Sequence, residues 1–393
     1  MRALLPELRR APRYGLPALF VVLGLAIAAH AAAERTTATR TAASPASLTA
    51  TSKRVGHFEY VVTDHEIDVY NIDRANRPVQ KLSMPQVESP RGVVADPRTA
   101  RLYISYGGQG GDSGRGSMLA YDLLRNRVIW QKNYDTGVDS IAITPNGRRI
   151  YMPVGEASGD GTWEIVDPAT GAVTGSVIAG EGAHNTIASL DGAYVYLAGV
   201  DYPYLSVAST ATNTVVQKIG PLRSGGRPFS INGKQTLAFT TAHDLLGFQV
   251  SSIKTGKVLF TVDVPGFSWD PKTYTRSPCH GIALSPDERR IYLIDTPNGY
   301  VHVFDVSKVP ASAPQHLADI KLPHAPPYDG WIQVSRDGRY VYVGRAGDVI
   351  GTRVLKVVGY LPPLQSTADS LEIDWRRGKP VATTSRYGLG YVR

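Results

Sequence analysis

One pattern of apolar and polar positions repeats along most of the chain. A short apolar segment ends in a turn of Ser, Thr, Asp, Pro and Gly, and a second segment rich in Tyr, Val and Ile follows. The clearest copies are residues 91–105, 141–152, 186–197, 282–293 and 332–343. Short alternating segments bounded by turn residues are typical of β-strands, and we find no stripe with the 3.6-residue period of amphipathic helices. The pattern therefore predicts an all-β fold.

The spacing of the copies predicts the architecture. First strands are expected near residues 93, 141, 186, 228, 282, 332 and 371, at intervals of 48, 45, 42, 54, 50 and 39 residues. Four short strands in each such interval are typical of a propeller blade. Segment 58–84 has outer strands without a first strand, and segment 370–374 has a first strand alone. We therefore predict a seven-bladed β-propeller of four-stranded blades, with its ring closed by N- and C-terminal strands; six or eight blades are the alternatives.

The first residues have the pattern of an export signal. Four arginines within residues 1–15 precede an apolar stretch, 16–29, and small residues follow at 29–33. This order is typical of a cleaved signal peptide, and the apolar stretch is short for a membrane anchor of about 20 residues. We expect a signal peptide at 1–33, a flexible Ala/Thr/Ser-rich leader at 34–55 and the propeller at 56–393. The mature protein would then be periplasmic or secreted, without a stable membrane span.

Composition narrows the function classes. The net charge is +8, and the first 15 residues contribute 4 − 1 = +3 of it. The rest of the chain has no run of Lys or Arg, so we expect no nucleic-acid partner. The single cysteine, Cys279, excludes a disulfide framework, and no c-type haem motif is present. We expect Cys279 to be a buried thiol.

The repeats carry a family resemblance. The Ser-Pro-Asp segment at 285–292 and the Asp-Gly-x-Tyr-Val-Tyr segments at 191–196 and 337–342 resemble the YVTN-type repeats of lactonase-like and surface-layer β-propellers. The resemblance covers roughly residues 56–393 and supports the architecture. It also implies, for the lactonase-like members, hydrolysis of a cyclic ester by a set of His, Arg and carboxylate groups. The full acidic and basic set of that family cannot be matched blade by blade.

Chain direction predicts which residues reach the central channel. The residue five positions before each turn enters the first strand at the channel mouth, on the face that also carries the loops after the second strands. The residues at or next to this position are Arg91, Asp139, His184, Arg227, His280, Asp329 and Asp369. Unpaired charges around a narrow axis are costly to bury, so this ring indicates a functional site. Hydrogen bonding of each residue to its own neighbourhood is the alternative.

Two chemistries fit the ring. Imidazoles and carboxylates from separate strands can hold one divalent metal ion, with His184, His280, Asp139 and Asp369 as candidate ligands. The same residues can act without a metal. His184 or His280 is then the general base, Arg91 stabilises an oxyanion, and Asp139 and Asp369 orient the histidines. We expect the substrate to contact Arg227, Asp329, Trp331, Tyr202 and Glu156. The other histidines, 57, 65, 302, 316 and 324, show no ligand spacing.

Several functions remain open at this point. We favour a lactonase-like hydrolase or a lyase acting on a lactone, sugar or related anion. The alternative is a non-catalytic propeller of the cell envelope that binds a glycan, peptide or protein partner. An electron-transfer subunit is a third class, but no cofactor-attachment feature supports it. Residues 107–117 are Gly-rich but lack the Gly-Lys-Ser/Thr ending of a phosphate-binding loop, so we expect a flexible loop on the mouth side.

Overall fold

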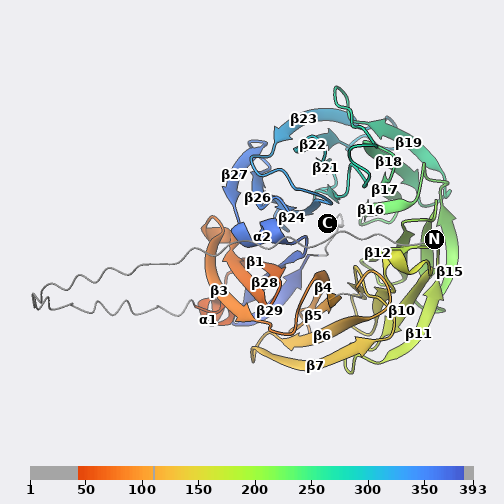
Figure 1. Ribbon diagram of the computed structural model, residues 1–393. Helices are drawn as coiled ribbons and strands as arrows, with labels where there is room; N and C mark the ends of the chain where they lie inside the picture. The colour runs from red at the N-terminus through yellow and green to blue at the C-terminus, as the bar shows by residue number, and fades with distance from the viewer. Residues whose placement is uncertain (1–42, 109–110, 385–393) are drawn as a thin grey trace, which may run out of the picture. The chain divides into compact units, whose positions relative to one another are not determined.

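Seven antiparallel sheets are arranged as the blades of a ring in this computed structural model (Figure 1), which describes residues 43–108 and 111–384. Six blades each consist of four consecutive strands. The first three are blade 1, with β4 (Pro90–Asp96), β5 (Arg101–Tyr106), β6 (Gly116–Asp122) and β7 (Arg127–Tyr134); blade 2, with β8 (Ala142–Ile143), β9 (Ile150–Pro153), β10 (Thr162–Val166) and β11 (Val173–Ile178); and blade 3, with β12 (Ala183–Ala188), β13 (Tyr194–Gly199), β14 (Leu205–Ser209) and β15 (Thr214–Ile219).

The next three blades have the same topology. They are blade 4, with β16 (Gly226–Ile231), β17 (Leu237–Ala242), β18 (Gly247–Ser252) and β19 (Val258–Asp263); blade 5, with β20 (Ile282–Leu284), β21 (Arg290–Asp295), β22 (Tyr300–Asp305) and β23 (Gln315–Lys321); and blade 6, with β24 (Trp331–Val334), β25 (Tyr340–Gly344), β26 (Asp348–Gly351) and β27 (Lys356–Tyr360). The first strands lie where the sequence repeats predict them.

Blade 7 joins the two ends of the propeller. Its strand order is β29–β28–β1–β2–β3, with β1 (Gly56–Thr63), β2 (Glu66–Asn71), β3 (Arg77–Ser83), β28 (Ser370–Arg376) and β29 (Lys379–Thr383). The C-terminal β28 is the first strand and pairs with the N-terminal β1, from Gly56 opposite Trp375 to Val61 opposite Ser370. The predicted closure and the count of seven blades are therefore confirmed. The fifth strand, β29, is an addition that the repeats do not predict.

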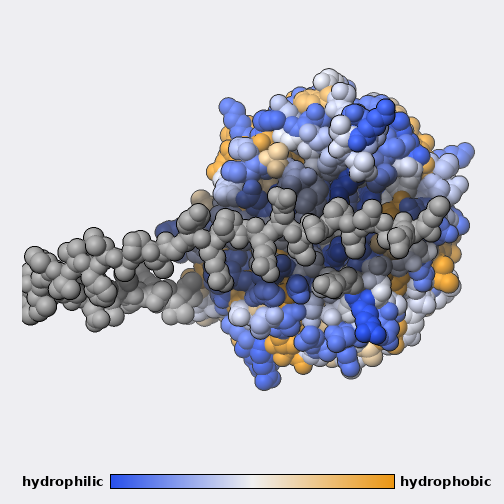
Figure 2. Space-filling view, in the orientation of Figure 1, coloured by the Kyte–Doolittle hydropathy of each residue, from blue (hydrophilic) through white to orange (hydrophobic). Residues whose placement is uncertain are grey.

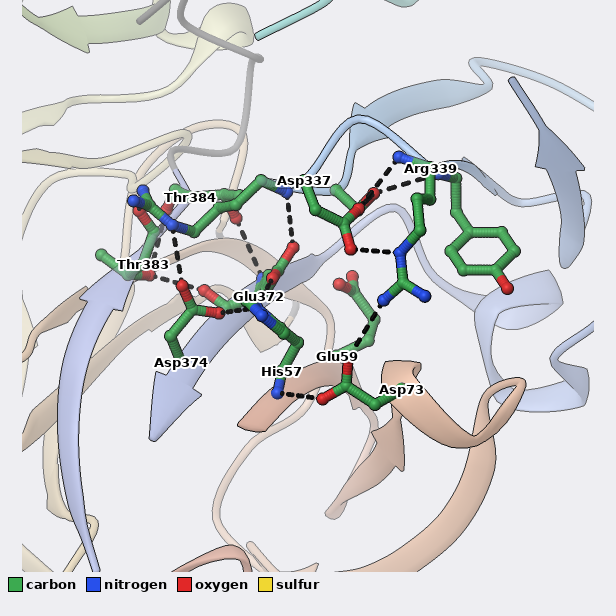
Figure 3. Close-up of polar contacts among 12 residues, drawn as sticks. His57, Glu59, Asp73, Asp337, Arg339, Glu372, Asp374, Thr383 and Thr384 are labelled. Atoms are coloured by element: carbon green, nitrogen blue, oxygen red, sulfur yellow. Dashed lines mark hydrogen bonds and ion pairs between the residues drawn. The ribbon is translucent and has the colours of Figure 1, made fainter. Parts of the chain in front are cut away.

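Polar contacts close this blade near the turn side of the ring (Figure 3). The Nδ1 atom of His57 on β1 lies 3.0 Å from Glu372 Oε1 and 2.8 Å from Asp374 Oδ1 on β28. Arg336, from the turn of blade 6, donates its backbone N–H to Glu372 and its Nε–H to Asp374. Glu59 lies opposite Glu372 in the strand pair, and both side chains are fully buried. The N-terminal strand is thus held by ion pairs as well as by the sheet.

The tyrosines of the second strands explain the aromatic repeat. Tyr151, Tyr196 and Tyr342 are almost fully buried between blades. Their hydroxyl groups lie 2.7 to 3.0 Å from the side-chain oxygens of Asn213, Gln235 and Asn76, which belong to turns of the following blades. A tyrosine whose aromatic side chain packs between two sheets, and whose hydroxyl group bonds to the next blade, adds buried apolar area and also fixes the position of one blade against the next. The outer strands leave apolar side chains exposed, and Figure 2 shows such residues at the rim of a largely hydrophilic face.

Four short helical segments complete the described structure: α1 (Pro45–Thr49), η1 (Ile72–Arg74), η3 (Glu156–Ser158) and α2 (Pro362–Ser366). Helix α1 differs from the expectation that 34–55 is a flexible leader. Its Ala46 and Leu48 pack against the core of blades 7 and 1, and the hydroxyl oxygen of the buried Thr49 accepts a hydrogen bond from the Gly378 N–H. The expected signal peptide, 1–33, lies outside the described residues. Neither described α-helix is long and apolar enough to cross a membrane.

Candidate functional site at the mouth of the channel

Bulges at the start of three first strands position three of the expected residues. The pairing of β4 with β5 skips Arg91, and the pairing of β12 with β13 skips His184. In β16, Arg227 and Pro228 lie opposite one residue of β17. A bulge adds a residue to one strand and re-aims its side chain. Arg91, His184 and Arg227 therefore leave the ladder at the mouth end of their strands.

The loops before and after the strands bring in the carboxylates. Asp139 precedes β8, where its Oδ1 accepts the Ser140 N–H at 2.8 Å and its carbonyl accepts the Ser105 hydroxyl at 2.8 Å. Glu156 begins η3, and its Oε2 lies 2.7 Å from Arg227 Nη1. Asp329, just before β24, forms an ion pair with Arg276. A backbone N–H thus fixes the Asp139 carboxylate, and arginines pair with Glu156 and Asp329.

The central pair of the site is Asp139 and His184. The Nδ1 atom of His184 lies 2.6 Å from Asp139 Oδ2, and both side chains are buried. An ionised carboxylate only accepts hydrogen bonds, so Nδ1 carries the proton and Nε2 has a free lone pair. Within the described part of the chain, Nε2 has no hydrogen-bond partner. This is the arrangement of a histidine prepared to take a proton or bind a metal.

A second imidazole and an indole lie beside this pair. The ring centroids of His280 and His184 are 5.6 Å apart, and the Trp331 ring is 4.7 Å from His280 and 6.1 Å from His184. Burial lowers the pKa of His280 to about 3; the charge of Asp329 opposes this shift, and the charge of Arg227 adds to it. His280 is therefore neutral near pH 7. No hydrogen-bond partner for its Nδ1 is found among residues 43–108 and 111–384.

Charged groups surround the imidazoles on the more open side. The exposed fractions of the side chains of Arg91, Glu156 and Arg227 are 25%, 28% and 13%. Burial would raise the pKa of Glu156, but charge attraction, including that of Arg227, and the hydrogen bond from Arg227 lower it below its usual value. Burial would lower the pKa of Arg91, but the carboxylates of Asp139 and Asp112 raise it. Both groups are therefore charged at neutral pH.

Three further residues of the site lie outside the ring of positions predicted from the first strands. Asp112, from the Gly-rich loop, forms an ion pair with Arg91. His243 Nδ1 lies 3.3 Å from Arg227 Nη2. Arg276 reaches Asp329 from the long segment between β19 and β20. All three come from irregular loops, where the position of a residue in the repeat does not predict the direction of its side chain.

Most of the predicted residues gather at the mouth, and two need separate description. Tyr202 lies elsewhere, since its ring is 5.5 Å from that of Tyr204 and the Lys218 ammonium of the outermost strand lies 5.3 Å from its centroid. The placement of Tyr202 beside the channel is therefore corrected. Asp369 is buried directly before β28, where its N–H donates to Thr367 Oγ1. Cys279 is buried as expected, and burial raises the pKa of its thiol.

The expected metal ligands do not form a ready three-ligand cluster. In the described residues, no three ligand atoms of His184, His280, Asp139 and Asp369 lie within 4.8 Å of one another. Asp139 is engaged with His184 Nδ1, which leaves His184 Nε2 and His280 Nδ1 as the available nitrogens. A metal at this site stays a prediction.

A separate cavity of about 240 Å³ lies toward the turn side of the channel. The first strands of blades 1, 2 and 3 line it, together with Thr383 and Thr384. Its lining is mainly apolar, with Val94, Ile141 and Ile187 among its side chains. The channel is therefore polar at its mouth and mainly apolar toward the turn side.

Comparison with known proteins supports the fold and no closer relationship. No protein-family model matches the sequence, and no curated protein matches it. The chain is similar to solved β-propellers. One is the dihydro-haem d1 dehydrogenase NirN in complex with DHE, with 14% identity, a TM-score of 0.53, and coverage of 84% of this chain and 73% of that one. Another is the β-propeller domain of Cps50 (Swd1) from Myceliophteria thermophila, with 8% identity, a TM-score of 0.54, and coverage of 76% and 94%.

At these identities the likeness establishes the propeller fold alone, because one fold supports many functions. The closer resemblance to YVTN-type and lactonase-like propellers has no support from a sequence family and stays a prediction. The site must be interpreted from its own chemistry.

Proposed function

We propose that the chain is an exported hydrolase or lyase that acts on a small carboxylate-bearing molecule, such as a lactone or a sugar acid. The observation that carries this proposal is the buried Asp139–His184 pair. The Nε2 of His184 has no partner in the described residues, its ring lies 5.6 Å from that of the neutral His280, and its Nδ1 lies 3.9 Å from Oε2 of Glu156, the ion-pair partner of Arg227. A fixed imidazole beside arginine groups unites a base with an anion-binding site.

His184 is the proposed general base. In hydrolysis, Nε2 takes a proton from water as the water oxygen attacks the lactone carbonyl. The ring C–O bond then breaks, and the imidazolium returns the proton to the departing alkoxide, giving a hydroxy acid. Arg227 stabilises the negative charge on the carbonyl oxygen, and Asp139 stabilises the imidazolium. In a lyase reaction the same nitrogen would take the proton next to a carboxylate, while the bond from the neighbouring carbon to its oxygen substituent breaks; a double bond forms and the substituent leaves as an alcohol after it is protonated.

A divalent metal, if His184 Nε2 and His280 held one, would polarise the same carbonyl and replace part of the arginine charge. The residue roles above do not depend on it. Asp139 still fixes the orientation of His184 in either case.

A panel of aldonolactones and uronic acids tests the proposal. Ring opening is followed by proton release, and elimination is followed by ultraviolet absorbance of the unsaturated product. We expect turnover by the wild type and a loss of about 100-fold or more in His184→Ala, consistent with removal of a general base. The exposed His65, in a turn of blade 7, provides the control His65→Asn, which should keep full activity. Binding of a panel member without turnover would favour the non-catalytic propeller.

Binding of a tetrapyrrole is a second candidate function. The similarity to a structure named as a dihydro-haem d1 dehydrogenase favours it, as do two imidazole nitrogens without partners next to arginines that suit carboxylates. Haem titration followed by its visible absorbance separates this candidate from the first. A shifted spectrum that is lost in both His184→Ala and His280→Ala would support it, and an unchanged wild-type spectrum would exclude it.

A further inference from the structure

A histidine and carboxylate cluster lies in the outer part of blade 5, away from the channel mouth. His302 on β22 lies directly opposite Asp319 on β23, and its Nδ1 is 2.7 Å from Asp319 Oδ1. The Nε2 of His316, also on β23, lies 2.7 Å from the same oxygen. One carboxylate oxygen therefore faces a nitrogen of each of two imidazoles.

A bulge is what brings these residues to one face. Residues three apart on a regular strand point to opposite faces, as alternation requires. The register of β22 and β23 shifts between Val303 and Phe304, so that His316 and Asp319 both reach His302. Other blades have a bulge at this place, for example β6–β7 and β14–β15. Blade 5 uses it to present two metal-binding residue types.

A buried carboxylate lies on the far side of His302. Its Nε2 is 3.1 Å from Asp295 Oδ2, and both side chains are fully buried. Asp295 also accepts hydrogen bonds from the backbone N–H and side-chain amide of Asn298. Both nitrogens of His302 thus face carboxylate oxygens, although a neutral imidazole has one proton to donate. A second proton or a metal ion at Nδ1 resolves this conflict, because Nε2–H can then donate to Asp295.

We propose that His302 Nδ1, His316 Nε2 and Asp319 form a binding site for a divalent transition-metal ion of the zinc class. Two imidazole nitrogens and one carboxylate oxygen suit zinc, with water as the fourth ligand. Asp295 then orients His302 in the way that carboxylates orient metal-binding histidines. The site is separate from the proposed catalytic residues and does not depend on the proposed function.

The spacing of the three atoms fits a tetrahedral ion. They all lie within 4.8 Å of one another. Ligands about 2.0 Å from a tetrahedral zinc ion are about 3.3 Å apart, so pairs now at 2.7 Å need to separate by only about half an ångström.

The contacts among His57, Glu372, Asp374 and Arg336 in blade 7, which we call the clasp, differ from this cluster. His57, Glu372 and Asp374 also place three potential ligand atoms close together. There, however, the Arg336 guanidinium forms an ion pair with Asp374, and the Arg336 backbone N–H donates to Glu372. No Lys or Arg in the described structure makes an ion pair with Asp295 or Asp319. The charge of blade 5 is therefore left for a cation.

The proposed ion would hold the segment that carries His280 and Arg276. The Phe267 ring packs 4.7 Å from the His302 ring, and Asn298 Nδ2 donates to the Ser268 carbonyl. At the other end of the segment, the Thr296 N–H donates to the Pro278 carbonyl, two residues before His280. A metal ion at His302 would hold in place the side chain against which Phe267 of this segment packs.

Zinc binding to the full, tag-free chain tests the site. We expect equilibrium dialysis with elemental mass analysis to give one Zn²⁺ per wild-type chain, and His316→Ala and Asp319→Asn to lose it. Both substitutions are at partly exposed positions, so the fold should persist and can be checked by circular dichroism. His184→Ala is the matched control and should keep the ion. Co²⁺ should give visible ligand-field bands in the wild type that disappear in His316→Ala.

Two outcomes would overturn the proposal. One is a wild-type chain that binds no Zn²⁺ at about 10 µM free ion, which corresponds to an affinity of roughly 7 kcal/mol. The other is a bound ion that survives in folded His316→Ala and Asp319→Asn but is lost in His184→Ala. That result would place the metal at the channel mouth instead. Zinc should also raise the melting temperature of the wild type and leave that of His316→Ala unchanged.

Discussion

Asp139 determines which nitrogen of His184 carries the proton. Its carboxylate accepts the Nδ1 proton at 2.6 Å, so Asp139→Asn replaces an acceptor by a group that can also donate. We expect a fall in kcat of about 100-fold or more, with a smaller change in KM, because the base loses both orientation and the partner of its cationic form. Steady-state kinetics on the substrate found in the lactone and uronate panel measures this.

The pH profile distinguishes this positioning role from simple destabilisation. Loss of the carboxylate removes a stabiliser of the imidazolium, so the acidic limb of kcat/KM should move to lower pH in Asp139→Asn. Asp160→Asn, in the same blade but exposed, is the matched control and should keep both rate and profile. A lower rate with an unmoved profile would show that Asp139 only supports the fold.

The sequence predicts the residue types of the site better than their contacts. Position along the repeat was enough to select His184, His280, Arg227 and Trp331, because each precedes or begins a first strand. It could not select Arg276, which comes from an irregular segment without a register. It also missed the cluster around His302, because a bulge changes which side chains share a face.

At the scale of elements, a tight contact between two loops shapes the mouth. The Gly-rich loop lies against η3, where the Ala157 N–H donates to the Asp112 carbonyl at 3.0 Å. Gly155, just before Glu156, has a φ of +98°, and a Cβ there would lie 2.2 Å from that carbonyl oxygen. The loops can approach this closely only because the position has no side chain.

Gly155→Ala should therefore displace Asp112 and Glu156 together. We expect a lower melting temperature and weaker binding of anionic panel members, since the Arg91–Asp112 and Arg227–Glu156 pairs both depend on this contact. Gly159→Ala is the matched control, because its φ is +68° and no atom lies within 4 Å of its Cβ position. Both variants carry backbone strain of order 1 kcal/mol. Equal melting temperatures and affinities for the two would contradict this role of the contact.

Some strands and helices could be predicted from the sequence, and others could not. Second strands were predictable because their buried tyrosines recur with the blade, and closure followed from a missing first strand in segment 58–84. Helix α1 was missed because an Ala/Thr/Ser-rich segment carries no apolar periodicity, although Ala46 and Leu48 pack on the core. The loop after β13 turns outward and places Tyr202 over Lys218, which the strand pattern does not report.

At the scale of the whole molecule, the ring depends on the joint between β1 and β28. The clasp around His57 lies at this joint (Figure 3). Hydrogen bonds to Asp374 and Glu372 raise the pKa of His57 to about 10, against the opposing effect of burial. Burial raises the pKa of Glu372 to about 7, although His57 lowers it. The protonated imidazole is thus the cation that lets two buried carboxylates lie together on one strand.

Because of the clasp, the free energy of unfolding of the propeller should decrease as the pH rises into the alkaline range. Because the folded pKa of His57 exceeds its unfolded value of 6.5, the stabilisation is complete below about pH 6.5 and is lost as the pH rises toward 10. Glu372 acts in the same direction at lower pH, since its raised pKa costs stability as the pH rises from about 4.5 through 7. Urea unfolding of the wild type should therefore show a midpoint that decreases from pH 7 to 9.5.

His57→Gln should flatten this alkaline decrease and lower the midpoint most at pH 7, where the wild type has the full ion pair. The turn variant His65→Asn, whose histidine is exposed and outside the clasp, should retain the wild-type slope with a constant offset. If His57→Gln kept the wild-type slope, the alkaline loss would come from other groups, and the sheet pairing of β1 with β28 would account for closure without the clasp. If the slope is lost as expected, β1 and β28 are joined by a proton-dependent contact, and loss of that proton weakens the blade that completes the ring.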